Sequence, residues 1–469
     1  MANDLARWQF ATTTIYHFFF VPVTIGLAFL VAVLQTVWYR NGNPDYKRMT
    51  RFFGTLLLIN VAIGVVTGLV QEFQFGMNWS TYSRFVGGVF GAPLAMEGIL
   101  AFFLESTFLG LWVFGWDRLP RRVHLACIWA VAAGSMLSAM FILIANSWMQ
   151  HPVGYKLNSQ GQAVLTNIWA LLVNPTFVWG YAHVILASLV TGCLVMLAVS
   201  AWYLRKGEHV ESFHRTAKVA LIVLIPTIAI QLSVGNQLGE IEARYQPMKI
   251  AAAEALWNSC QPCSFSAAQV GGFSQSNQTA SEIIPIPHLL SVLATGTWSG
   301  PVTGLNQLQA EYQKKYGPGN YIPNVAIQYW SIRVMAGLGS LVLLFALWGG
   351  WLLQRGRLRR SRLFLWVSVW AVITPFLMNT AGWLLTESGR QPWIVQGLQK
   401  TVNANSPSVS VTEIWISLAV FVASYIVLGA ADLALMLRYS RHGLAHADAE
   451  AAEPAGGPDT PARAPSLTY

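Results

Sequence analysis

Apolar residues fill long runs of this chain, and short polar connections separate the runs. A helix that crosses a membrane needs about 20 apolar residues, and nine of the runs are long enough. The runs lack the period-two alternation of barrel strands, and irregular backbone cannot face lipid. The pattern therefore predicts an all-α integral membrane protein with nine transmembrane helices, at residues 13–38, 52–72, 94–115, 124–147, 178–203, 216–236, 328–353, 363–386 and 412–438.

Basic residues give this predicted bundle a direction. If the nine helices alternate, the basic clusters of five connections all lie on one side, and the other side is much poorer in Lys and Arg. The positive-inside rule assigns the rich side to the cytoplasm, so we expect the N-terminus outside and the C-terminus inside. The clusters are Arg40 to Arg51, Arg118 to Arg122, Arg205 to Lys218, Arg355 to Arg362, and Arg438 with Arg441.

One connection is long and lies on the predicted outer side. Loops of this length are usually functional or disordered. The chain is therefore expected to consist of helices 1 to 6 (1–235), an extracytoplasmic loop (236–327), helices 7 to 9 (328–440) and a disordered cytoplasmic tail (441–469). The tail prediction depends on a composition rich in Ala, Pro and acidic residues.

Composition supports burial in a membrane. Hydrophobic residues make up 54% of the chain and charged residues only 10%, against about 25% charged in soluble domains. The net charge of +9 is explained by the topology of the basic clusters, so we do not expect nucleic acid as a partner. The N-terminus lacks the basic start and small-residue cleavage site of a signal peptide, so we expect the first apolar run to be retained.

Ionisable side chains inside membrane helices are costly, which makes each of them a candidate for a functional site. Two histidines, His17 and His183, lie within the apolar depth. His183 and Met335 lie on different helices, both of which begin on the outer side of the membrane. At about 1.5 Å per residue, both residues lie roughly 7–11 Å below the outer membrane boundary. The full set is His17, Glu97, Glu105, His183, Arg333 and Glu387.

A His and a Met at matching depth are a known axial pair for a haem iron. Arg333, two residues before Met335, is positioned to pair with a haem propionate. A second interpretation stays open, because a membrane Met often packs in the core and a single buried His can bond a neighbouring helix.

Two carboxyls on the third helix form a possible ladder. Glu97 and Glu105 are eight residues apart, which places them about 80° apart around a regular α-helix. Such a ladder can carry protons toward the cytoplasm. Glu105 lies near mid-membrane, where a carboxyl is costly to ionise and can hold and release a proton; alternatively it bonds a neighbouring helix. Glu387 either serves a site in the outer half or pairs with Arg390.

Four cysteines divide into two kinds. Cys127 and Cys193 lie within helices and are expected only to pack. Cys260 and Cys263 lie in the outer loop, where a local disulfide is the simplest expectation. A zinc site would need further ligands, and the loop offers only His288.

Several motifs closely resemble subunit I of cytochrome bd-type quinol oxidases, over nearly all of residues 5–440. The resemblance lies in Gly389 to Trp393 after Glu387, Gln71 to Trp79, Phe90 to Gly98 continuing through Phe102 to Thr107, Tyr16 to Phe18, and Ala145 to Gln150. Nine helices with an outer N-terminus agree with the family.

The resemblance implies three haems, namely a low-spin haem b, a high-spin haem b and a haem d. It implies that His183 and Met335 are the axial pair of the low-spin haem and that His17 and Glu387 are ligands of the two high-spin haems. Glu97 is implied as a further residue at the oxygen-reducing haem. Arg333 and Arg390 are implied as propionate or potential-tuning partners, and Trp383 as an aromatic residue between haems.

The resemblance also makes the outer loop the quinol-binding loop, of the short type, with Lys249 and Glu254 as its quinol residues. Quinol oxidised near the outer face would release its protons outside, electrons would pass from the low-spin to the high-spin haems, and O2 would be reduced to water with cytoplasmic protons delivered through Glu105. This separates charge without a pump. The implied partners are subunit II, a small single-span subunit, membrane lipid, quinol and O2, in the bacterial plasma membrane.

Three other classes fit less well. A haem–copper oxidase would need about six intramembrane His, and a dihaem cytochrome b would need two His pairs on two helices. A transporter would explain buried Glu and Arg, but it should show an inverted repeat and would be colourless. The sequence contains none of these His sets and no such repeat.

Overall fold

The computed structural model describes residues 2–452, and within them nine helical segments are long and apolar enough to cross a membrane. The prediction of nine membrane helices is confirmed, with each predicted run inside its segment to within one residue. The segments are α1 (Ala2–Asn41), α2 (Pro44–Met77), α3 to α4 (Ser80–Phe114), α5 (Arg121–Gln150), α7 (Pro175–Lys206), α8 (Val210–Tyr245), α12 (Val325–Gln354), α13 to α14 (Arg362–Gly389) and α15 as far as Arg441.

Two of these segments are not regular α-helices. The third consists of α3 (Ser80–Met96), a π-helix η1 (Glu97–Phe102) and α4 (Phe103–Phe114). The eighth is α13 (Arg362–Ala371) followed by α14 (Thr374–Gly389), because Pro375 cannot continue the hydrogen bonding of α13. Helix α15 (Val411–Ala452) runs into the predicted tail as far as Ala452. The rest of that prediction, 453–469, lies outside the described residues.

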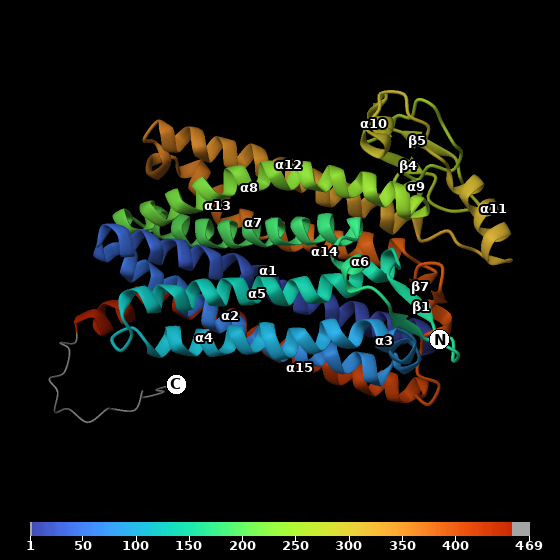
Figure 1. Cartoon of the computed structure of the whole chain (residues 1–469). Helices are drawn as coiled ribbons and strands as arrows, with labels where there is room; N and C mark the ends of the chain where they lie inside the picture. The colour runs from blue at the N-terminus through green and yellow to red at the C-terminus, as the bar shows by residue number, and fades with distance from the viewer. Residues whose placement is uncertain (1, 453–469) are drawn as a thin grey trace.

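The helices lie side by side along one direction, and α9, α10, α11, β4 and β5 gather at the end of the bundle where α1 begins (Figure 1). The connection between α8 and α12 is folded. It contains helices α9 (Pro247–Ala253), α10 (Leu289–Thr295) and α11 (Leu305–Tyr316), and the antiparallel pairs β3–β6 (Phe265–Ser266 with Pro285–Ile286) and β4–β5 (Gln269–Gly271 with Ala280–Glu282).

Smaller elements close the same end. The connection from α5 to α7 holds the hairpin β1–β2 (Tyr155–Leu157, Ala163–Leu165) and helix α6 (Ile168–Leu172). After α14, the pair β7–β8 (Trp393–Val395, Gln399–Lys400) leads toward α15. A short 3-10 turn, η3 (Thr401–Asn403), follows β8, and another, η2 (Leu358–Arg360), connects α12 to α13 at the opposite end of the bundle.

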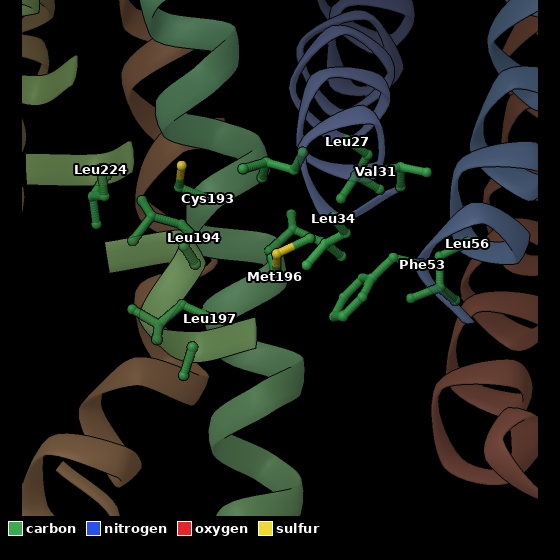
Figure 2. Close-up of a cluster of buried hydrophobic side chains, with 14 of the residues drawn as sticks. Leu27, Val31, Leu34, Phe53, Leu56, Cys193, Leu194, Met196, Leu197 and Leu224 are labelled. Carbon is green, nitrogen blue, oxygen red and sulfur yellow. The ribbon is translucent and has the colours of Figure 1, made fainter. Parts of the chain in front are cut away.

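The centre of the bundle is a dry apolar core between α1, α2, α7 and α8. Figure 2 shows Leu34 of α1 beside Met196 of α7, with Leu27 and Val31 further along α1 and Phe53 of α2 nearby. These residues fix the helices against one another.

Two glycines let α1 and α7 touch. A Cβ on Gly26 would lie 2.7 Å from the Cα of Gly192, and a Cβ on Gly192 would lie 2.6 Å from the Cα of Gly26. Small residues of this kind allow membrane helices to pack backbone to backbone. A buried amide joins α1 to α2, because Asn60 donates to the carbonyl of Phe20 at 2.9 Å and to Thr24 Oγ1 at 2.7 Å.

Candidate functional site

His17 of α1 contacts Thr67 of α2 through one of its ring nitrogens. Its Nδ1 lies 2.9 Å from Thr67 Oγ1. That hydroxyl donates to the carbonyls of Ile63 and Gly64, at 3.2 and 3.0 Å, so its oxygen accepts from Nδ1. This arrangement favours a proton on Nδ1, and Nε2, which has no hydrogen bond in the described part of the chain, then keeps its lone pair for a metal.

His183 lies near the beginning of α7. Asn174 caps this helix by accepting from the backbone amide of Thr176 at 3.2 Å, and Pro175 suits the first helical position. The Nε2 of Gln231, on α8, lies 3.3 and 3.2 Å from the two ring nitrogens of His183. One turn further along α8, a Cβ on Gly235 would lie 3.3 Å from the ring, so glycine leaves room for the imidazole.

Met335 lies on α12 beside another glycine. A Cβ on Gly382 of α14 would lie 3.3 Å from the Met335 sulfur. Helices α8 and α14 each pack against both α7 and α12. The structure therefore places His183 and Met335 within one group of four helices.

Arg333 binds the loop between α8 and α12. Its Nη2 lies 2.7 Å from Glu254 Oε2 and 2.7 Å from the Ser266 carbonyl, and Nη1 donates to the Ala253 carbonyl. The guanidinium also lies 3.6 Å from the ring centre of Tyr329. Sequence reasoning placed Arg333 and Glu254 in separate roles, and the structure brings them together as a buried ion pair.

Lys249 is the second buried charge of the loop and lies in the first turn of α9. Its Nζ donates to Glu242 Oε2 at 2.7 Å and to Gln150 Oε1 at 2.8 Å. Burial lowers the pKa of Lys249 against the opposing charge of Glu242. Burial also raises the pKa of Glu254 to about 7, although Arg333 opposes the shift. The pKa values of both loop groups are therefore shifted toward neutral pH from those of free side chains.

Glu387 closes α14 and uses both of its oxygens. Arg390 Nη2 donates to Oε2 at 2.5 Å, and Asn146 Nδ2 of α5 donates to Oε1 at 2.9 Å. The pairing with Arg390 that the sequence allowed is present. The Glu387 side chain remains 31% exposed, and each carboxylate oxygen has a second lone pair. Nearby, Trp383 packs edge to face on Phe18 of α1 at 5.1 Å.

Glu97 and Glu105 both face α5, as the ladder prediction requires. Ser138 Oγ donates to Glu97 Oε1 at 2.7 Å, and a Cβ on Gly134, one turn earlier on α5, would lie 3.2 Å from the Cβ of Glu105. The π-helix that begins at Glu97 turns less per residue than an α-helix, so it brings the two side chains closer to one face. Inserted π turns are frequent at functional sites.

A cavity lies beside Glu105. It has a volume of about 310 Å³ and lies between α2 and α4, and its lining is apolar except for Glu105 and Ser106. The carboxyl of Glu105 therefore lies beside a surface pocket of the bundle.

The loop disulfide is present as expected. Cys260 and Cys263 are bonded, while Cys127 and Cys193 are free and buried.

Several residues of the site were missed by sequence reasoning. They are uncharged or lie at the end of a helix, and each one bonds a predicted site residue: Thr67, Ser138, Asn146, Gln150, Gln231 and Glu242. A usable signal existed for Asn146 and Gln150, which are amides one turn apart in an otherwise apolar run.

The donors fit haem. Haem supplies four nitrogen ligands of its own, so its iron needs only one or two protein donors. His17, His183, Met335 and Glu387 are single donors on four different helices, and glycines leave space at the first three. Among the described residues, no cluster of three or more His, Cys, Asp or Glu side chains could hold a bare metal ion.

The fold and these donors define a multi-pass membrane protein with a site suited to haem. The chain belongs to the family of cytochrome bd terminal oxidase subunit I, whose model matches residues 5–444. This confirms the resemblance and makes the chain an oxidoreductase of the respiratory chain in the bacterial plasma membrane. Members of the family use haem groups and quinol and work with a second subunit.

Individual relatives cover nearly the whole chain. It is 46% identical over 444 residues to cytochrome bd ubiquinol oxidase subunit 1 of Bacillus subtilis (strain 168), covering 94% of each chain. It is 37% identical over 497 residues to cytochrome bd-II ubiquinol oxidase subunit 1 of Escherichia coli (strain K12), covering 94% of this chain and 96% of the relative. The solved bd oxidase from Geobacillus thermodenitrificans matches with a TM-score of 0.85 and 29% identity, over 94% of this chain and 98% of that one.

Proposed function

We propose that this chain is the haem-binding catalytic subunit of a quinol:O2 oxidoreductase that oxidises quinol near the outer face and reduces O2 to water, building a proton motive force without pumping. The observation that carries the proposal is the contact of 2.9 Å between His17 Nδ1 and Thr67 Oγ1, which leaves Nε2 without a hydrogen bond among the described residues. A hydroxyl that accepts from Nδ1 leaves the lone pair of Nε2 for iron, in a chain similar over its length to cytochrome bd subunits.

The haem positions follow from the donors. His183 and Met335 hold the low-spin haem b, and His17 and Glu387 hold the two high-spin haems, one of type b and one of type d. Glu97 would lie at the oxygen-reducing haem, Arg390 would be a propionate or potential-tuning partner, and Trp383 would be an aromatic residue between haems. Haem, when bound, supplies the electron transfer and the oxygen chemistry.

The loop residues handle quinol. Lys249 and Glu254 are buried groups whose pKa values are moved toward neutrality, which suits groups that exchange protons with a quinol near neutral pH. Arg333 holds Glu254 in place at 2.7 Å and so ties the loop to the helix that carries Met335.

The orientation of the chain in the membrane determines whether the reaction builds a proton motive force. The basic connections lie on the cytoplasmic side by the positive-inside rule, with the N-terminus outside. Quinol protons then leave outside, and protons for water arrive from the cytoplasm through Glu105 and Glu97. Subunit II is the main partner, with a small single-span subunit as an additional one.

The test is a reduced-minus-oxidised visible spectrum of the purified oxidase. We expect His183→Ala and Met335→Ala each to abolish the low-spin haem b band, while the high-spin bands persist. A full low-spin band together with normal quinol oxidation in both variants would contradict the assignment.

A further inference from the structure

A continuous chain of hydrogen bonds connects the loop lysine to Glu387. Lys249 Nζ donates to Gln150 Oε1 at 2.8 Å, Gln150 Nε2 donates to Asn146 Oδ1 at 2.8 Å, and Asn146 Nδ2 donates to Glu387 Oε1 at 2.9 Å. Glu242 and Arg390 terminate the two ends with ion pairs at 2.7 and 2.5 Å. We call Gln150 and Asn146 the amide bridge.

The bridge has one polarity. Every donor points from the ammonium of Lys249 toward the carboxylate of Glu387, and each amide accepts on one side and donates on the other. Bonds aligned in this way polarise and strengthen one another, above all where water is excluded. Lys249 and Gln150 are 3% and 6% exposed, so water does not replace a broken link at that end.

A second contact ties the same two elements together. A Cβ on Gly389 would lie 2.5 Å from Lys249 Cγ and would also collide with the side-chain oxygen of Gln328. Lys249 therefore lies directly against the end of α14, two residues from Glu387. A shift of the lysine is transmitted both through the bridge and through this packing.

We infer that Gln150 and Asn146 are positioning residues that couple the quinol site to the high-spin haem held by Glu387. This inference rests on the proposed function, which assigns Lys249 to quinol and Glu387 to a haem. Because coupling is reciprocal, quinone bound near Lys249 changes the orientation of the Glu387 carboxylate, and the state of Glu387 changes quinone affinity.

The experiment measures the shift of the high-spin haem bands when quinone is added to the oxidised, purified oxidase complex. Decylubiquinone and 2,3-dimethyl-1,4-naphthoquinone are titrated separately. In Gln150→Leu we expect the quinone-induced shift to fall by more than half, and KM for quinol to rise about tenfold with a smaller change in kcat, because Lys249 loses a hydrogen bond to its charge.

Gln150→Glu separates the two functions of Gln150. It keeps an acceptor for Lys249 but has no amide to donate to Asn146. We expect KM near that of the unmodified enzyme and loss of the quinone-induced shift. This variant also preserves side-chain volume, so it answers the question if Gln150→Leu assembles poorly.

Gln35→Leu is the matched control, since Gln35 is a fully buried amide in another network, bonded to His124 at 2.8 Å and to Trp112 at 2.6 Å. Gln35→Leu should change neither the quinone-induced shift of the high-spin haem bands nor KM for quinol. An undiminished shift in both Gln150 variants overturns the coupling. If Lys249→Met leaves KM unchanged, or Glu387→Ala leaves the high-spin bands unchanged, the proposed function itself fails and the coupling fails with it.

Discussion

Thr67 offers a sharp test of the His17 assignment. The perturbation is Thr67→Val, which replaces the hydroxyl with a methyl group and removes the acceptor that lies 2.9 Å from His17 Nδ1. Thr67 is fully buried, so water does not take the place of the hydroxyl. The imidazole then either leaves its Nδ1 proton without a partner or changes tautomer and turns its proton toward the iron position.

The size of the effect follows from that buried donor. Leaving a buried hydrogen-bond donor without a partner costs about 1–3 kcal/mol, and about 1.4 kcal/mol corresponds to a factor of ten. Haem affinity at His17 should therefore fall roughly 5- to 150-fold, in line with the 10- to 100-fold typical when an outer partner of a metal-bound histidine is lost.

The assay is the haem content of the purified complex after gel filtration, together with its reduced-minus-oxidised spectrum. Thr50→Val is the control, because Thr50 is also fully buried on α2 and donates only to the carbonyl of Tyr46, at 2.7 Å. We expect loss of high-spin haem in Thr67→Val and full occupancy in Thr50→Val. Equal occupancy in both would refute the tautomer argument.

Three further predictions concern protons and quinol. Glu105→Gln should lower oxygen consumption by a large factor with the haem spectrum intact, whereas turnover above about half of the unmodified rate would reject a proton role. Because the pKa of Glu254 is raised to about 7, kcat/KM for quinol should fall as the pH drops below 7 and Glu254 is protonated. Glu254→Gln should remove this pH-dependent fall, and a pH profile unchanged in the variant would argue against a role of Glu254 in quinol oxidation. Gly389→Ala should displace Lys249 and raise KM roughly 5- to 150-fold for an overpacking cost of about 1–3 kcal/mol, while Gly239→Ala, with open space around its Cβ position, should leave KM unchanged.

The sequence predicted the membrane helices well because each depends on local composition alone. Helix ends were less predictable. The run that ends near residue 236 continues as helix to Tyr245, and this extension carries Glu242 to Lys249. Polar residues can extend a helix beyond the membrane when tertiary contacts support them, so hydropathy does not show where such a helix stops.

Side-chain pairs across the bundle were the least predictable part. Arg333 and Glu254 are 79 residues apart, and nothing in either local sequence indicates that they meet. The interpretation of Arg333 as a haem partner came from depth, while its observed partners come from how the loop folds over α12. The π-helix at Glu97 was also hidden, because apolar flanks such as Ile99 and Leu100 are equally compatible with a regular α-helix.

The charges of the loop explain how it is fastened to the bundle. Each buried charge has a partner of opposite sign, Lys249 with Glu242 and Arg333 with Glu254, as burial of charge requires. The two ion pairs connect the loop to different helices. Arg333 lies two residues before Met335 on α12, and the bridge from Lys249 ends on α14 at Glu387. Under the proposed function, a loop fastened at these two points rearranges around a quinol only by straining both helices that carry proposed iron ligands, so we expect substrate binding to affect the haem environment.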